Sequence, residues 1–142
     1  MNSREYFYDL GKLIYQIDNA YEDYGKKTNL NSPNLLWILY ALNDGKMHTQ
    51  KSVCADWQIP RSTTNTIIKE LEEKKLVTLS HLNGTRREMI VGLTEEGKKF
   101  ADGALTKLYE KEKQIYEKMK NPEKFLEELR NFVDLLSILS EE

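Results

Sequence analysis

The chain has little of what marks secreted, disulfide-bonded or membrane proteins. Its single cysteine, Cys54, excludes an intramolecular disulfide and favours a reducing compartment. No apolar run approaches the roughly 18 residues of a membrane span. The opening segment MNSREYFYDL carries acidic side chains instead of the continuous apolar stretch of a secretory signal. We therefore expect a cytoplasmic protein with no membrane partner.

Patterns typical of enzymes and metalloproteins are missing too. The seven glycines are scattered instead of forming a phosphate-binding loop, and neither a G-x-S-x-G nor an H-E-x-x-H motif occurs. The two histidines, His48 and His81, have no close ligand pair, so a zinc site that combines them with Cys54 is disfavoured. We expect one histidine at a sheet edge and the other on a strand. The sequence thus predicts neither an enzyme nor a cofactor-dependent protein.

An excess of positive charge is absent as well. The chain has 21 basic and 23 acidic residues, a net charge of −2, which excludes a uniformly basic coat for nucleic acid. The distribution is uneven, because residues 46–98 hold 9 basic and 7 acidic side chains whereas both flanks are net negative. A local basic patch still attracts phosphate, since salt screens charges beyond about 8–10 Å. The middle of the chain is therefore the candidate region for an anionic partner.

The two ends of the chain predict long amphipathic helices. Apolar residues recur at steps of three and four over about 4–25, 95–119 and 122–140, and Gly25 is expected to end the first helix. A chain of 142 residues has little core to cover such helices. We therefore expect self-association through them, with an ordinary core stripe as the alternative. The last helix has a heptad seam of Phe125, Leu129, Phe132, Leu136 and Leu139.

The middle of the chain changes from helical to alternating periodicity. Two short helices followed by a β-hairpin form a winged helix-turn-helix. The predicted fold class is therefore mainly α with a small β-hairpin wing, an α+β winged helix-turn-helix between N- and C-terminal dimerisation helices. The expected elements are helices over about 33–43, from Thr49 to Trp57 and over about 61–74, and strands over 77–80 and 89–93 joined by the turn Asn83-Gly84.

The helix predicted at 61–74 has the surface of a DNA-reading helix. Ile67, Ile68 and Leu71 form its buried stripe, and the opposite face carries short polar side chains that fit the major groove. Asn65 suits an adenine edge, and the cations suit phosphates. The candidate DNA-binding residues are Arg61, Ser62, Thr63, Asn65, Thr66 and Lys69 on the helix, and Arg86 and Arg87 at the hairpin tip. For the tip arginines, which fit a minor groove, a solvated hairpin is the alternative.

Three stretches of the chain resemble the MarR family of multiple-antibiotic-resistance-type transcriptional regulators. They are IPRSTTNTIIKELEEKKLV at 59–77, TRR at 85–87 and VGLTEEG at 91–97. The resemblance implies a homodimer that binds double-stranded DNA through two winged motifs on a pseudo-palindromic operator. It also implies dimerisation helices at 1–31 and 99–142 around a DNA-binding domain at 32–98, and a cleft where a small molecule relieves repression. We therefore expect a ligand-responsive repressor.

Several positions depart from the family pattern. Thr85 replaces the usual acidic residue of the wing, Leu79 stands where an arginine is common, and Thr66 and Glu70 stand where bases are frequent. These changes predict weaker phosphate attraction than a typical member has. The alternative function is a protein-interaction module of the same fold whose DNA face has decayed, which the acidic residues near the end of the helix at 61–74 would favour.

The candidate ligand-binding residues are aromatic. Five of the eight tyrosines lie in the first 24 residues, where interface packing is the expected role and an aromatic ligand pocket the alternative. By the resemblance, Trp37 and Tyr40 face the interdomain region. We therefore take Tyr15, Trp37 and Tyr40 as candidates for binding a small aromatic or amphipathic effector. Cys54 is expected to be a small buried residue, and a redox sensor is its alternative.

Overall fold

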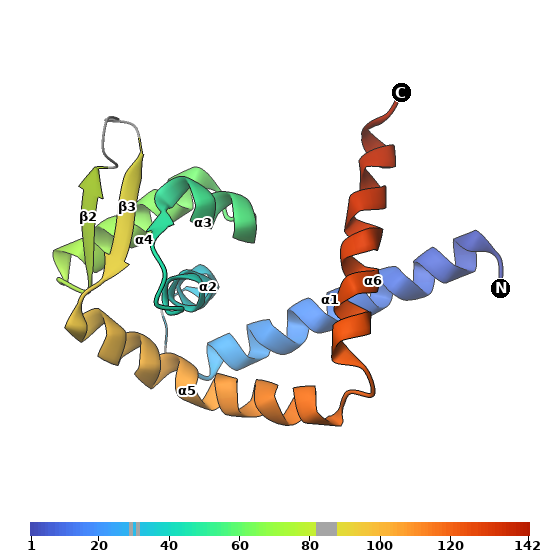
Figure 1. The fold of residues 1–142 in the computed structure, drawn as a ribbon, viewed down its shortest axis with the longest axis horizontal. Coiled ribbons are helices and arrows are strands. Elements are labelled where there is room, and N and C mark those ends of the chain that lie inside the picture. The colour runs from blue at the N-terminus through green and yellow to red at the C-terminus, as the bar shows by residue number, and fades with distance from the viewer. Residues whose placement is uncertain (29, 31, 82–87) are drawn as a thin grey trace. The chain divides into compact units, whose positions relative to one another are not determined.

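The computed structural model describes residues 1–28, 30, 32–81 and 88–142, which form two compact units, Met1–Thr106 and Lys107–Glu142. The fold is mainly helical with one small antiparallel sheet, so the predicted class is confirmed (Figure 1). The first unit contains α1 (Ser3–Lys26), α2 (Pro33–Leu42), β1 (His48–Thr49), α3 (Gln50–Trp57), α4 (Arg61–Glu73), β2 (Val77–His81), β3 (Met89–Leu93) and the start of α5 (Glu95–Lys118). The second unit contains the rest of α5, α6 (Pro122–Leu135) and the 3₁₀ helix η1 (Leu136–Ser140).

Side-chain caps fix where these helices begin. The Ser32 hydroxyl accepts a hydrogen bond from Asn34 N at 3.3 Å, and Asn121 Oδ1 accepts one from Lys124 N at 3.1 Å. Each cap is followed by a proline at the first helical position, where the missing N–H costs nothing. Thr49 caps α3 in the same way. The helix starts predicted from these residues are therefore confirmed.

The sheet has three strands in the order β1-β3-β2. Strands β2 and β3 pair antiparallel from Val77↔Leu93 to His81↔Met89. Strand β1 adds His48↔Val91 and Thr49↔Ile90, and it was not predicted because two residues are too short to show an alternating pattern. His48 thus lies at the sheet edge and His81 on a strand, as expected. The predicted turn Asn83-Gly84 lies outside the described residues.

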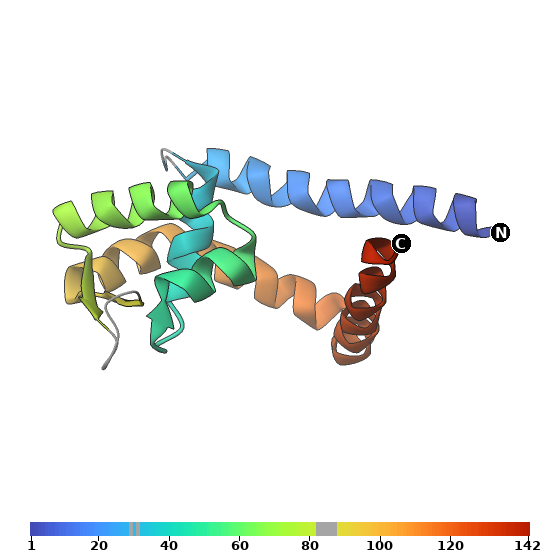
Figure 2. The same ribbon diagram turned by 90° about the horizontal axis from the view of Figure 1, so that it is seen from above.

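The core of the first unit lies among α2, α3, α4 and the sheet. Figures 1 and 2 show α3 and α4 beside the β2–β3 pair, with α2 next to them. Ile67, Ile68 and Leu71 are buried, so the predicted stripe of α4 is confirmed. The buried cluster consists of Ile38, Ala41, Leu42, Val53, Ile59, Ile67, Ile68, Leu71, Val77 and Val91.

The structure corrects three local predictions. Gly25 does not end α1, which continues to Lys26; it is a buried point where α2 approaches, because a Cβ there would already touch Leu36 Cδ2 at 3.6 Å. The last helix is α-helical only to Leu135 and then tightens into 3₁₀ geometry, as helix ends often do. Cys54 is half-buried, not buried, because Val53 alone turns fully into the core.

None of the helices in the described part of the chain is both long and apolar enough to cross a membrane.

Candidate nucleic-acid interface

The turn between α3 and α4 is tight and well fixed. Gln58 adopts left-handed backbone geometry with φ 51° and caps α3 by donating its N–H to Cys54 O. The next residue, Ile59, is buried, and its N–H also donates to Cys54 O at 3.2 Å. Helix α4 then starts at Arg61, and no side chain caps its first N–H groups. Such a helix start favours anions, because its N–H groups have no partner within the helix.

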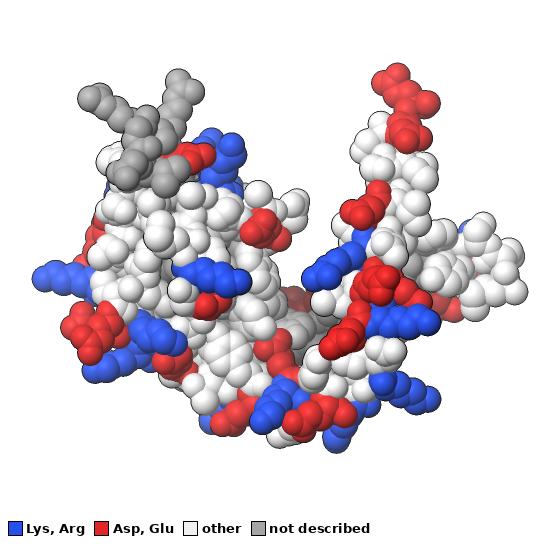
Figure 3. Space-filling model, in the orientation of Figure 1, with Lys and Arg blue, Asp and Glu red and all other residues white. Residues whose placement is uncertain are grey.

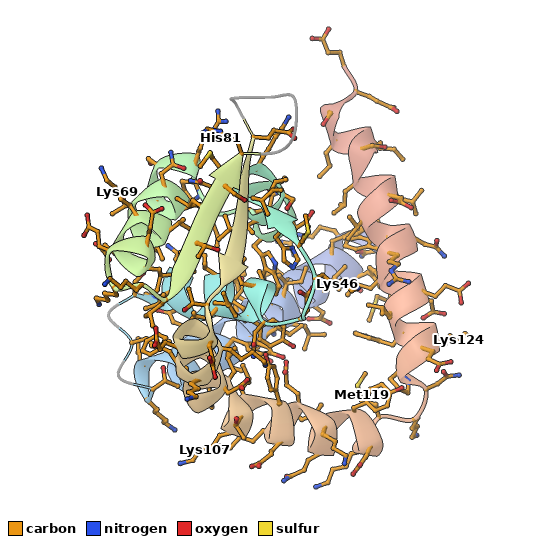
Figure 4. The ribbon with its side chains drawn as sticks, turned by 60° about the vertical axis from the view of Figure 1, so that its left-hand side comes forward. Lys46, Lys69, His81, Lys107, Met119 and Lys124 are labelled. Atoms are coloured by element: carbon orange, nitrogen blue, oxygen red, sulfur yellow. The ribbon has the colours of Figure 1, made fainter. Side chains whose placement is uncertain are left out.

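The outward face of α4 carries the sequence-predicted residues. Arg61, Ser62, Asn65, Thr66 and Lys69 are exposed, and Thr63 is half-buried. Figure 4 shows Lys69 pointing away from the body of the fold. The structure therefore brings six of the eight candidate DNA-binding residues onto one helix. The other two, Arg86 and Arg87, lie outside the described residues.

Two side chains on this face are held by hydrogen bonds that sequence patterns do not reveal. Thr66 Oγ1 donates to Ser62 O at 3.0 Å, which ties its hydroxyl to the helix backbone. Asn65 Oδ1 accepts a hydrogen bond from Gln50 Nε2, so the first residue of α3 contacts the centre of the α4 face. Gln50 thus contacts the candidate site, although it is not among the DNA-binding residues predicted from the sequence.

Thr64 was also missed, for a different reason. Its side chain is fully buried, and its hydroxyl has no hydrogen-bond partner among the described residues. Threonine is common on both polar and buried helix positions, so the run Ser62-Thr63-Thr64 gives no sign of which residue turns inward. The geometry of α4 assigns Thr64 to the core together with Ile67, Ile68 and Leu71.

The charge of the face is mixed. Glu70, Glu72 and Glu73 are exposed near the end of α4, beside the exposed Lys69. Figure 3 shows basic and acidic side chains interspersed over the visible face of the winged-helix part instead of one continuous basic patch. Long-range attraction of phosphate is therefore modest, and short-range polar contacts carry more of any recognition of DNA.

A glycine junction connects the sheet to α4 and α5. Thr94 N donates to Leu76 O at 3.0 Å, and Thr94 Oγ1 donates to Lys75 O at 2.8 Å while it accepts from Gly97 N at 3.0 Å. A Cβ at Gly97 would lie only 1.8 Å from Leu76 O, so the first turn of α5 packs directly against this carbonyl. The stretch Thr94–Gly97 thereby fixes where α5 leaves the sheet.

Two carboxylates, the exposed Asp44 and the half-buried Asp102, are held by charge-assisted hydrogen bonds. His48 Nε2 lies 2.8 Å from Asp44 Oδ1, and Lys46 N donates to the same oxygen at 2.9 Å; these contacts lower the pKa of Asp44. Asn43 and Lys98 each donate to Asp102 Oδ1 at 3.0 Å and lower its pKa. The second cluster joins the end of α2 to α5.

The described part of the chain contains no cluster of metal-binding side chains. Within the described ranges, no group of three or more His, Cys, Asp or Glu side chains is placed to hold a metal ion.

The aromatic candidates separate into two groups. Trp37 stacks on Trp57 with ring centroids 5.3 Å apart, and Tyr40 contacts both rings edge-on. The ring centroid of Tyr21 on α1 lies 5.1 Å from that of Trp37. Tyr15 is 71% exposed and lies six residues before Tyr21 on α1, outside this cluster. The structure therefore brings Trp37 and Tyr40 together with two rings that sequence reasoning did not select.

A groove of about 280 Å³ lies between α1 and α2. It is lined by Asp18, Tyr21, Glu22, Gly25, Pro33, Leu36 and Trp37. The α1 members recur at steps of three and four, which is the signal that would have found them. The groove combines aromatic and aliphatic surface with two carboxylates, and none of the described residues that line it is basic.

Solved structures resemble this fold, although the sequence matches no protein-family model and no curated protein. A MarR family regulator from Neisseria meningitidis is 26% identical with a TM-score of 0.77, over 99% of this chain and 95% of that one. The transcriptional regulator BldR from Sulfolobus solfataricus is 21% identical with a TM-score of 0.73, over 94% and 99%. The regulator BpsR from Bordetella bronchiseptica, whose DNA binding is regulated by 6-hydroxynicotinic acid, is 20% identical with a TM-score of 0.63, over 94% and 99%.

These likenesses span nearly the whole chain and agree with the stretches that carry the sequence resemblance. The predicted winged helix-turn-helix is present, with α3 and α4 as its two helices and the β2–β3 pair as the base of its wing. The fold is that of the MarR family regulators among these solved structures, as the sequence resemblance predicted.

Proposed function

We propose that this chain is a homodimeric, sequence-specific DNA-binding regulator that acts on a pseudo-palindromic operator as a ligand-responsive repressor. The observation that carries the proposal is the two-sided surface of α4. Its aliphatic residues are buried, whereas Ser62, Asn65, Thr66 and Lys69 are exposed on the opposite face. An exposed helix of this kind fits the major groove, and two copies would read half-sites about one helical turn apart.

The chemistry of the side chains predicts which of them contact phosphates and which contact bases. Arg61 and Lys69 neutralise phosphates and position the protein, whereas Asn65 and the hydroxyl groups reach base edges. Arg86 and Arg87 of the wing tip, proposed from the sequence alone, contact the flanking minor groove. Because the charge is mixed, we expect the logarithm of affinity to fall with the logarithm of salt with a slope of roughly 4–8 per dimer.

Homodimerisation is supported by apolar side chains that neither unit covers by itself. On α1, five of them are each between 42% and 54% exposed: Tyr6, Phe7, Leu13, Ile14 and Ile17. On α6, Phe125 is 52% exposed and Val133 57% exposed. A monomer that leaves both faces in water loses the free energy of burial, about 25 cal/mol for each Å² of apolar surface. We propose residues 1–31 and 99–142 as the dimerisation part and residues 32–98 as the DNA-binding domain.

The groove between α1 and α2 is our proposed effector site. Its volume of about 280 Å³ and its Tyr21 and Trp37 rings suit a small aromatic or amphipathic molecule. Asp18 and Glu22 favour a neutral or cationic ligand over an anionic one. In some dimers the spacing of the two α4 helices does not match the two half-sites. A ligand that binds these dimers more tightly would increase their fraction and so lower the affinity for DNA.

The DNA-binding proposal is tested by selection from randomised duplexes, followed by affinity measurements across a salt series. We expect an enriched inverted repeat, and we expect Lys69→Ala to reduce the salt slope by about one per half-site. Arg87→Ala should weaken binding across sequences. Lys107→Ala removes the same charge from α5 and should leave the slope unchanged. A selection without an enriched repeat would refute the proposal and favour the alternative function, a protein-interaction module.

The homodimer is tested by measuring the mass in solution for two matched variants of α6. Leu129→Glu places a charge in the heptad seam and should yield monomers. Asn131→Glu places the same charge on the opposite side of the helix and should leave the dimer intact. Dissociation of both variants, or of neither, would contradict an interface built on this seam.

The effector site is tested by intrinsic fluorescence, because Trp37 and Trp57 stack beside the groove. Titration with N-methyl-4-phenylpyridinium, a planar aromatic cation, should quench the tryptophan emission and reduce DNA affinity. Asp18→Asn should weaken that response, because it removes one of the two carboxylates. An equal response to biphenyl-4-carboxylate would contradict the charge preference.

A further inference from the structure

Trp37 of α2 belongs both to the wall of the groove and to a row of aromatic rings that ends on α3. Its ring centroid lies 5.1 Å from that of Tyr21, the other ring that lines the groove. It also lies 5.3 Å from the centroid of Trp57, with the two planes inclined by only 23°. Tyr40 contacts both tryptophans edge-on. The row therefore connects α1, through α2, to the last residue of α3.

The rings of this row differ in how firmly they are held. The neighbours of Trp37 in the chain, Leu36 and Ile38, are 1% and 0% exposed, so the core fixes this part of α2. The two tyrosines of the row are half-buried. Trp57, in contrast, is 36% exposed and stands at the end of its helix. Of the rings around Trp37, Trp57 therefore has the most room to move.

The turn that follows Trp57 has a backbone geometry that costs free energy. Gln58 has φ 51°, in the left-handed region that residues other than glycine rarely adopt. The N–H groups of Gln58 and Ile59 both donate to Cys54 O. A residue keeps such a geometry only while its surroundings hold it there. The stacking of Trp57 on Trp37, directly beside Gln58, is one of the contacts that hold this turn.

We propose that a planar aromatic ligand of the groove acts as a wedge, which separates Trp37 from Tyr21 and displaces Trp57 together with the α3–α4 turn. The inference rests on the proposed effector site and the proposed DNA binding, and it gives the route from one to the other. Stacked carbon atoms lie about 3.5 Å apart, so an inserted ring needs roughly 7 Å between its two neighbours. The two centroids are now 5.1 Å apart. Insertion therefore moves the rings apart by about 2 Å.

This displacement reaches α4 within a single protomer. Helix α4 begins at Arg61, four residues after Trp57, so a loosened turn places the α4 face less well for DNA. The stabilisation from a stacked aromatic pair corresponds to a factor of roughly two to ten in an equilibrium constant. We therefore expect the wedge to lower the affinity for DNA by roughly two- to tenfold per protomer.

Two substitutions of Trp57 test the route, because Trp57 is not among the described residues that line the groove. Trp57→Leu removes the ring but keeps an apolar side chain that favours a helix. Trp57→Phe keeps a ring that can stack, and it serves as the matched control. Each variant retains Trp37 as its only tryptophan, so quenching by N-methyl-4-phenylpyridinium reports binding in the groove directly.

The first measurement is the affinity of the full-length proteins for the duplex that the wild type selects, with and without saturating N-methyl-4-phenylpyridinium. In Trp57→Leu the ligand should still quench Trp37, but the affinity for DNA should change less than twofold. The response of Trp57→Phe should lie between those of Trp57→Leu and the wild type. A Trp57→Leu protein whose affinity falls as far as that of the wild type would refute the route, and so would equal responses of the two variants.

Hydrogen exchange of the wild type gives a second measurement, which does not depend on the stability of a variant. In the absence of DNA, the ligand should speed exchange at the N–H groups of Gln58 and Ile59 by roughly two- to tenfold, because it weakens the stack beside them. The N–H of Asn43, which donates to Leu39 O at the end of α2, is the internal control and should keep its rate. Unchanged exchange at Gln58 and Ile59 in a protein that binds the ligand would refute the wedge.

The outcomes also separate the wedge from the functions on which it rests. If the ligand does not quench the wild type, the proposed effector site fails, and the wedge fails with it. If the wild type binds no duplex, the DNA-binding proposal fails, while hydrogen exchange still decides whether the ligand moves the turn. If the wild type binds both ligand and DNA but the turn keeps its exchange rates, both functions stand and the wedge alone is refuted.

Discussion

Replacement of Gly97 by alanine tests the junction that sets the start of α5. The added Cβ would lie 1.8 Å from Leu76 O, 2.8 Å from Leu76 C and 3.2 Å from Leu76 Cα. All three are backbone atoms, so no side-chain rotation relieves the contact. The first turn of α5 and the start of β2 must instead move apart by more than about 1 Å to restore an ordinary contact.

The cost of this movement follows from the bonds that cross the junction. Overpacking costs about 1–3 kcal/mol, and the hydrogen bond from Thr94 N to Leu76 O contributes about 1 kcal/mol. Alanine offsets up to about 1 kcal/mol of this cost, because it stabilises a helix more than glycine does. We therefore expect Gly97→Ala to lower the free energy of unfolding by about 3 kcal/mol, which corresponds to a fall in Tm of roughly 10 °C.

The same helix provides the control. Gly103 also lies in α5, but a Cβ there meets nothing within 4 Å. Gly103→Ala should therefore stabilise the protein by up to about 1 kcal/mol. Urea unfolding of both variants at equal protein concentration gives the two values. If Gly97→Ala were as stable as Gly103→Ala, the close approach of α5 to Leu76 would be refuted.

Two further predictions concern buried and charged groups of the same unit. Thr64→Val removes a fully buried hydroxyl that has no partner among the described residues, so urea unfolding should show a gain of about 1 kcal/mol, and a loss of stability would mean that the hydroxyl is satisfied. Asp102→Asn should matter more at neutral than at acidic pH. The hydrogen bonds from Asn43 and Lys98 lower the pKa of Asp102 below 3.8, so its stabilising effect is present above that value and is lost as the pH falls through the lower folded-state pKa. A stability difference from the wild type that does not shrink between pH 7 and about pH 3 would contradict this assignment.

Local signals were sufficient for the helices of the chain and for strands β2 and β3. Ser32-Pro33 and Asn121-Pro122 mark helix starts because the cap and the proline act within one turn of the chain. The stripe of Ile67, Ile68 and Leu71 assigns the inner face of α4 because all three are large and aliphatic. Both kinds of signal depend only on neighbours in sequence, so they are visible without coordinates.

Errors occurred where the partner of a residue is distant in sequence. Gly25 has the character of a helix stop, but it is buried within α1 where Leu36 of α2 packs against it, and no local pattern contains that information. Strand β1 exists only because β3 pairs with it. The groove likewise joins Asp18 and Glu22 to Trp37 across two helices, so the carboxylates looked like ordinary solvated charges in the sequence.

The contact between Gln50 and Asn65 is the most consequential of these distant relationships. Composition assigned Asn65 to a base edge because an amide can pair with adenine, yet an unrestrained amide presents its donor and acceptor in either order. The residue that contacts Asn65 lies fifteen positions earlier, beside a helix cap and a strand pair that belong to the framework of the fold. We therefore expect the placement of the Asn65 side chain to depend on the turn between α3 and α4 as well as on α4 itself. A substitution such as Ile59→Ala, which loosens that turn without touching the α4 surface, should flatten the preference at the Asn65 base pair in the selection described above. A preference that survives while the free energy of unfolding falls would show that α4 alone places the Asn65 side chain.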